Sequence, residues 1–113
     1  MDQTLTNDRS TWAGLFETIN TERRAQLLTI DVLDGDFGDQ LEASGMPFDS
    51  LEFDSRSDVI VVAVAGREPG APVVLRHLIH GPQTVDLLDR PHSPLVMRIV
   101  DTDGIENLLT FQP

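Results

Sequence analysis

The sequence contains no cysteine, no lysine and no tyrosine. Without cysteine there can be no disulfide framework, no thiolate nucleophile and no cysteine-ligated zinc or iron–sulfur site. The same absence suits a reducing compartment, so we expect a cytoplasmic protein. No segment approaches the roughly 20 apolar residues of a membrane-spanning helix. The segment Met1–Leu5 lacks the basic start and the apolar run of a signal peptide, which predicts a soluble protein that is not exported.

Positive charge is also scarce. Eight arginines stand against 19 aspartates and glutamates, which gives a net charge of −11 at pH 7 and a pI near 4.3. Such a field repels phosphate backbones and anionic lipid heads, so we expect neither a nucleic-acid nor a membrane partner. An acidic surface keeps a small protein in solution, and it can attract a basic partner. The Asp-rich, Lys-free composition suits a GC-rich bacterial genome.

The length and the apolar content set the scale of the fold. A chain of 113 residues, 40% of them hydrophobic, is typical of one globular domain with one core. We therefore expect a single domain over residues 1–113, with residues 1–7 as a loose N-terminus.

An amphipathic helix is predicted from about Arg9 to Arg24. Asn7 and Asp8 are suitable N-cap residues before it, because their side chains can accept hydrogen bonds from the first free N–H groups. One stripe of the helix is apolar, and its members are Trp12, Leu15, Phe16 and Ile19. Trp12 and Phe16, one turn apart, are the expected anchors against the rest of the fold.

From Gln26 onward the apolar rhythm changes to the alternation of half-buried strands. Strands are predicted at Leu28–Val32, Leu41–Ala43, Leu51–Phe53, Val73–Ile79, Thr84–Leu88, Leu95–Val100 and Ile105–Phe111. The continuous apolar run Val59–Ala65 predicts a central strand covered on both sides. Compact turn sequences separate these segments at residues 55–58, 68–72 and 101–104, and Gly81-Pro82 ends the strand before it.

Short strands with tight turns favour antiparallel pairing, because parallel strands need long crossovers. The predicted fold class is therefore α+β. It consists of one N-terminal helix packed on a curled antiparallel sheet or half-barrel of about seven to eight strands.

The run Asp34-Gly35-Asp36-Phe37-Gly38-Asp39 has the alternating carboxylates of a calcium loop. An EF-hand loop needs a glycine at its sixth position and a glutamate at its twelfth. Here the glycines fall second and fifth, and the twelfth residue counted from Asp34 is Gly45. We interpret the run as a hairpin turn in which glycine supplies a positive φ and aspartate caps the backbone.

The three histidines do not form a metal-binding pattern. His77 and His80 are three residues apart on a predicted strand, so their side chains leave opposite faces. His92 lies in a separate loop. We expect His77 to pack on a strand surface and the other two to be solvated.

No other motif indicates a catalytic or cofactor site. The serines lack a nucleophile elbow, and there is no phosphate-binding glycine loop or dinucleotide fingerprint. We expect no cofactor and no metal. The sequence does not decide whether the protein is an enzyme, but the balance of these features is against catalysis.

Most of the chain resembles a family of small bacterial proteins, domain-of-unknown-function family 5335. The similar segments span roughly residues 10–112 and are Trp12–Phe16, Thr29–Leu33, Phe37–Ala43, Met46–Phe48, Leu75–His77, Pro82–Val85, Leu95–Gly104 and Leu108–Phe111. The family has no assigned activity, so the resemblance implies no functional residues.

The resemblance does single out polar residues within strands that are unusual for packing alone. The candidate residues of an interaction surface are Gln40, Glu42, Arg76, His77 and Arg98. A structural alternative is a cross-strand pair in which Arg76 or Arg98 contacts Glu42 or Asp31.

Three functions follow from these observations. The first is a non-enzymatic binding or interaction module that associates with itself, as a homodimer, or with another protein through an exposed sheet edge. The second is a carrier with a small-molecule ligand between the sheet and the N-terminal helix. The third, which the sequence supports least, is an enzyme that uses a buried carboxylate.

Overall fold

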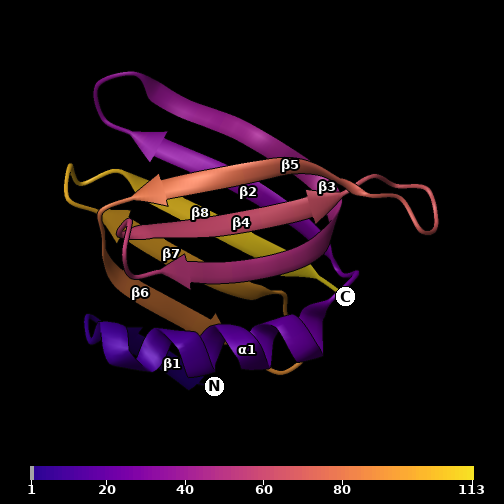
Figure 1. Cartoon of the computed structure of the whole chain (residues 1–113), viewed down its shortest axis with the longest axis horizontal. Helices are drawn as coiled ribbons and strands as arrows, with labels where there is room; N and C mark the ends of the chain where they lie inside the picture. Colours follow the sequence, from indigo (N-terminus) through magenta and orange to yellow (C-terminus); the bar gives the residue numbers. More distant parts are fainter. Residues whose placement is uncertain (1) are drawn as a thin grey trace.

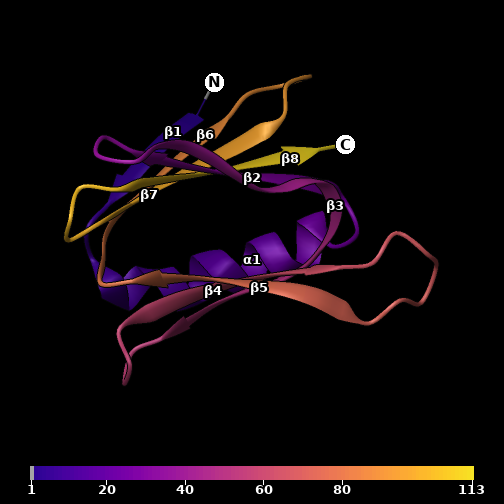
Figure 2. The same ribbon diagram turned by 90° about the horizontal axis from the view of Figure 1, so that it is seen from above.

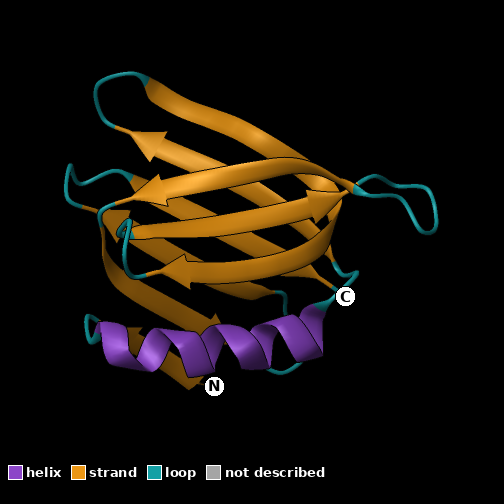
Figure 3. Ribbon diagram, viewed as in Figure 1, coloured by secondary structure: helices purple, strands orange, loops and turns teal. Residues whose placement is uncertain are grey.

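The computed structural model describes the backbone of residues 2–113 and the side chains of residues 6–113. Its elements, in chain order, are β1 (Asp2–Thr6), the 3-10 turn η1 (Arg9–Thr11), α1 (Trp12–Arg23), β2 (Leu27–Asp34), β3 (Gly38–Asp54), β4 (Val59–Ala65), β5 (Val73–His80), β6 (Pro82–Asp89), β7 (Leu95–Asp101) and β8 (Glu106–Gln112). Figure 3 shows one helix beside a sheet, so the change of rhythm near Gln26 marks the boundary between them.

The helical segment begins at Asp8, as the capping pattern predicts. The Asp8 carboxylate accepts hydrogen bonds from the backbone N–H of Ser10 at 3.0 Å and from its hydroxyl at 2.7 Å. These two bonds favour the ionised form and lower the pKa of Asp8 below its ordinary value. The side chains of Trp12, Phe16 and Ile19 are buried, which confirms the predicted apolar stripe.

All eight strands belong to one antiparallel sheet in the order β1-β6-β7-β8-β2-β3-β4-β5. The sheet has two ends, β1 and β5, and does not close into a barrel. It curls into two layers, which Figure 2 shows from the side. One layer contains β1, β6, β7, β8, β2 and the first part of β3, and the other contains the last part of β3, β4 and β5. The predicted class of a helix on a curled antiparallel sheet is confirmed.

β3 is the strand that joins the two layers, and here the sequence prediction was wrong in detail. Leu41–Ala43 and Leu51–Phe53 were predicted as separate strands, but both lie in one bent strand of 17 residues. The pairing of β3 with β2 shifts register twice, and its pairing with β4 shifts once after Phe48. Such bulges bend a strand and increase its twist, so β3 can leave one layer and enter the other.

α1 lies along one edge of β3, opposite to the edge that pairs with β4 (Figure 1). The Asn20 side-chain amide donates to the carbonyl oxygen of Leu51 at 3.0 Å, and its oxygen accepts from the N–H of Leu51 at 2.8 Å. Just after the helix, Ala25 and Gln26 exchange backbone hydrogen bonds with Phe48 at 2.9 and 2.8 Å. The helix therefore replaces the strand that would otherwise cover this edge.

The core fills the space between the layers. Its largest fully buried side chains are Trp12, Phe16, Phe48, Phe111, Leu28, Ile30, Leu51, Ile60, Leu95, Met97, Ile99 and Leu109. Trp12 packs edge to face against Phe53, with 4.9 Å between the ring centres. Phe48 packs against Phe111 in the same way, also with 4.9 Å between the ring centres. Because these contacts join the helix and both layers, the domain has one core.

The N-terminal segment is a second correction. Residues 1–7 were predicted to be loose, but Asp2–Thr6 form β1 and pair antiparallel with Val85–Asp89 of β6. The segment has no apolar alternation, so nothing in its own sequence indicated a strand.

Arg9 ties the start of the helix to the sheet. Its guanidinium forms an ion pair with Asp58 and donates to the carbonyl oxygen of Pro82 at 2.7 Å. The same group lies 5.6 Å from the ring centre of Trp12 and 6.0 Å from that of Phe53. Arg9 thus joins η1 to the β3–β4 turn and to the start of β6.

Gly81 makes the corner between β5 and β6, where the chain passes from one layer to the other. Its φ is +61°, and a Cβ placed there would lie 2.9 Å from the hydroxyl oxygen of Thr102. Glycine is the residue that fits both requirements. In the part of the chain that the structure describes, no helix has the length and apolarity needed to cross a membrane.

Candidate interaction surface

β5 lies at one end of the sheet and has one strand partner. It pairs antiparallel with β4 from the Val59–His80 pair to the Ala65–Val73 pair. Among the described residues, no strand is hydrogen-bonded to the opposite edge of β5. Free N–H and C=O groups along such an edge can pair with a strand of another chain. In Figure 1 this edge of β5 is the upper edge of the front layer, and Figure 2 shows the β2–β3 hairpin in the other layer.

The side chains of β5 alternate between the interior and the solvent. Leu75, His77 and Ile79 face the interior, whereas the alternate residues Val74, Arg76, Leu78 and His80 are exposed. Two of the exposed residues are large and apolar, since 58% of Val74 and 47% of Leu78 is accessible. Large apolar side chains beside an unpaired edge are the features that β-strand addition uses.

The outer face of β4 continues this surface. Val61 is the register partner of Leu78, and it is half-buried. Ala63 is the register partner of Arg76, and it is 3% exposed. We call the outward residues Val61, Val74, Arg76, Leu78 and His80 the β5 surface.

The charge around the β5 surface differs from that of the molecule as a whole. Residues 69–85 contain no aspartate or glutamate, but they contain Arg76, His77 and His80. The chain carries a net charge of −11, so this is a local departure from its acidic character. An acidic segment would therefore meet less repulsion here than elsewhere.

His77 points away from this surface, into the space between the layers. Its Nε2 lies 2.8 Å from Oδ1 of Asn107 on β8, in the opposite layer. Asn107 is the one buried polar residue among those described, and its Nδ2 also donates to the carbonyl oxygen of Ile99 at 3.4 Å. The pair satisfies two polar groups across the core. His80 and His92 are exposed, as the sequence predicted.

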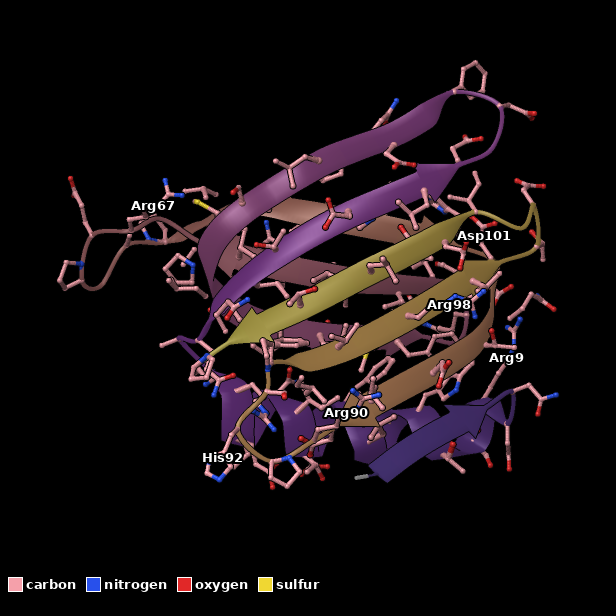
Figure 4. All side chains as sticks on the ribbon, turned by 180° about the vertical axis from the view of Figure 1, so that it is seen from behind. Arg9, Arg67, Arg90, His92, Arg98 and Asp101 are labelled. Atoms are coloured by element: carbon pink, nitrogen blue, oxygen red, sulfur yellow. The ribbon has the colours of Figure 1, made fainter. Side chains whose placement is uncertain are left out.

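Arg98 lies on the other layer, on the outer face of β7. Figure 4 shows it there, from the side opposite to Figure 1. It forms an ion pair with Glu106 of β8. Its partner is thus neither of the two acids that the cross-strand interpretation named, Glu42 and Asp31.

Gln40 and Glu42 lie at the far end of the β2–β3 hairpin. We call residues 34–42 the hairpin arm. Asp34 accepts a hydrogen bond from the N–H of Asp36 at 2.9 Å and Gly38 has a φ of +81°, which confirms the predicted hairpin turn. The arm exposes two large apolar side chains, Phe37 at 80% and Leu41 at 60%.

The structure therefore divides the five predicted surface residues among several places. Arg76 lies on the β5 surface, His77 lies beneath it, and Arg98 lies on the opposite layer. The other two belong to the hairpin arm. Sequence analysis missed the exposed apolar residues Val74 and Leu78. A signal was present in the sequence, because both the odd- and the even-numbered positions of Val73–Ile79 include apolar residues. A strand with this pattern is expected to be covered on both faces.

A hollow of about 310 Å³ lies between α1 and β3, where the carrier hypothesis places its ligand. It is lined by Ala13, Phe16, Glu17, Asn20, Leu51, Glu52 and Phe53. One of its polar side chains, Asn20, already binds the backbone of Leu51. A carboxylate enzyme would need a buried acid, and every described Asp and Glu is exposed or half-buried.

Comparisons with known proteins identify the family of the chain but give no activity for it. A family model, described as a family of unknown function, DUF5335, matches residues 3–113. An uncharacterised protein of Aquifex aeolicus strain VF5 is 22% identical over 102 residues, which cover 90% of this chain and 86% of that protein. No solved structure gives a significant match.

Proposed function

The chain belongs to the DUF5335 family, whose function is unknown, and we propose that it is a protein-interaction module that binds its partner at the free edge of β5. The observation that carries this proposal is the unpaired edge of β5 beside the exposed side chains of Val74 and Leu78. An added strand would satisfy the free backbone groups, and its side chains would cover the two apolar residues. No catalytic step is required of the module.

The other end of the sheet offers a useful contrast. β1 is also an end strand, but its sequence is Asp2-Gln3-Thr4-Leu5-Thr6, which is mostly polar. Polar and charged residues are a common way of protecting an edge from association. β5 carries Arg76 as its one fully charged residue, and on the outer face it lies between the apolar residues Val74 and Leu78. The two ends therefore differ in the chemistry that association requires.

A cross-linking experiment tests the proposal. The photoreactive residue p-benzoylphenylalanine replaces Leu78, and the chain is irradiated both as purified protein and inside expressing cells. We expect an adduct at position 78 that mass spectrometry identifies, either as a second copy or as another protein. The same probe at Thr18, on the exposed face of α1, is the matched control and should give none.

Specificity for the edge is tested by a second substitution. Val74→Glu adds a negative charge to the β5 surface without touching the core, and it should abolish the adduct at position 78, because both the apolar contact and the acid-free character of the surface are lost. If position 78 gives no more adduct than position 18, and light scattering reports a monomer at high protein concentration, the proposed function is wrong.

A further inference from the structure

Two strands, not one, leave an edge free at the open side of the curled sheet. β4 pairs with β3 from Phe48 onward, so the earlier residues of β3 are paired with β2 alone. β5 supplies the other free edge. In Figure 1 the β2–β3 hairpin and β5 both lie at the upper side of the molecule, and Figure 2 shows that they belong to different layers. Each copy of the chain therefore has two unpaired edges on the same side.

The two elements also have opposite charge. The hairpin arm, residues 34–42, contains four carboxylates and no arginine. The segment that contains β5, residues 69–85, contains an arginine and no carboxylate. Both elements expose large apolar side chains, which are Phe37 and Leu41 on the arm and Val74 and Leu78 on β5. Each is thus chemically matched to the other, and neither is matched to itself.

The register of the hairpin places the matching residues on the outer face. Leu41 is paired with Asp31, and Asp39 is paired with Leu33. The neighbouring pair Val32 and Gln40 lies between them and therefore on the other face. If the free edge of β3 in one copy pairs with the free edge of β5 in another copy, Leu41 and Asp39 lie on the same outer face as Leu78 and Arg76.

We propose that the partner of the β5 surface is the hairpin arm of a second copy, with each copy giving its arm to the other. This inference rests on the proposed function and names its occupant. Since both free edges lie on the same side of the molecule, a single twofold axis on that side forms both contacts, and the assembly closes as a dimer. The four free edges on this side are then paired, and the acidic arms lie against the acid-free β5 strands.

Charge reversal tests the pairing. In sedimentation equilibrium of the full chain we expect a dimer whose association constant falls about tenfold in Arg76→Glu and in Asp39→Arg. The double variant should recover most of the loss, because the pair is re-formed with its charges exchanged. Both residues are exposed, and neither side chain has a hydrogen bond or an ion pair among the described residues, so we expect both variants to fold.

Arg90→Glu is the control, because it changes the net charge by the same amount in the exposed β6–β7 loop. The inference is overturned if R76E lowers the association constant no more than R90E does, or if the double variant does not restore it. The proposed function is left intact by either result. A monomer at every concentration also overturns it, and an adduct of another protein at position 78 would then identify a different occupant. Absence of both the dimer and the adduct defeats the two proposals together.

Discussion

Asp8 shows how one short side chain starts the helical segment. Its carboxylate binds two donors of Ser10, and these bonds place its pKa below the ordinary value of 3.8. A folded-state pKa below that of the unfolded chain means that ionised Asp8 stabilises the fold. That contribution is present above pH 3.8 and is lost as the pH falls through the folded-state pKa.

Removal of the Ser10 hydroxyl should raise the pKa of Asp8. In Ser10→Ala the side-chain donor at 2.7 Å is gone, while the backbone N–H at 3.0 Å remains. We expect the pKa, followed by NMR titration of the Asp8 carboxyl, to rise toward 3.8 without reaching it. Thr18→Ala, on the exposed face of α1, should leave the titration unchanged. An unaltered Asp8 titration in S10A would show that the hydroxyl is not the main cause.

Val74 and Leu78 mark the limit of prediction from single residues. An apolar residue in a strand pattern is expected to face a core, and that expectation holds for Leu75 and Ile79. Whether a second apolar face is also covered depends on which strands lie beside it. Strand order is a property of the whole sheet, so the exposure of these residues could not be inferred from their local sequence.

At the scale of elements, α1 serves as the cover of a strand edge. The amide of Asn20 binds both the N–H and the carbonyl oxygen of Leu51, as a neighbouring strand would. Leu51 is only 1% exposed, so water cannot replace these bonds well. The edge of β3 near Phe48 and Leu51 is thereby closed, whereas the edge of β5 is left open.

Asn20→Ala should lower the free energy of unfolding by about 1–3 kcal/mol, because two backbone groups of Leu51 lose their partners. Urea denaturation measures the change. Thr18→Ala is the matched control on the same helix, and it should stay within about 0.5 kcal/mol of the parent. Equal stability of the two variants would mean that the Asn20 contact does not hold the helix to the sheet.

The elements differ in how well their own sequences predict them. The helix and the later strands follow clear apolar periods, and the structure confirms them. The bend of β3 was missed because Gly45 and Pro47 indicate a break in a strand, whereas here they accompany bulges within it. β1 was missed because its residues are held by pairing with β6, which is distant in sequence.

At the scale of the whole molecule, the sheet leaves its two ends in different states. β1 is short and mostly polar, and β5 is longer and has apolar side chains on both faces. The acidic hairpin arm and the acid-free strand β5 lie on the same side of the molecule. A monomer gains nothing from this arrangement, whereas an assembly that pairs the free edges uses all of it.

The central claim is that the free edge of β5 is paired in the working assembly. Hydrogen–deuterium exchange tests it most directly, by comparing the dilute chain with the assembled form, which is the concentrated dimer or the complex captured at position 78. We predict that the β5 amides not bonded to β4 exchange more slowly in the assembled form, while those of β1 exchange at the same rate in both. Equal exchange of the β5 amides in the two samples would contradict the claim.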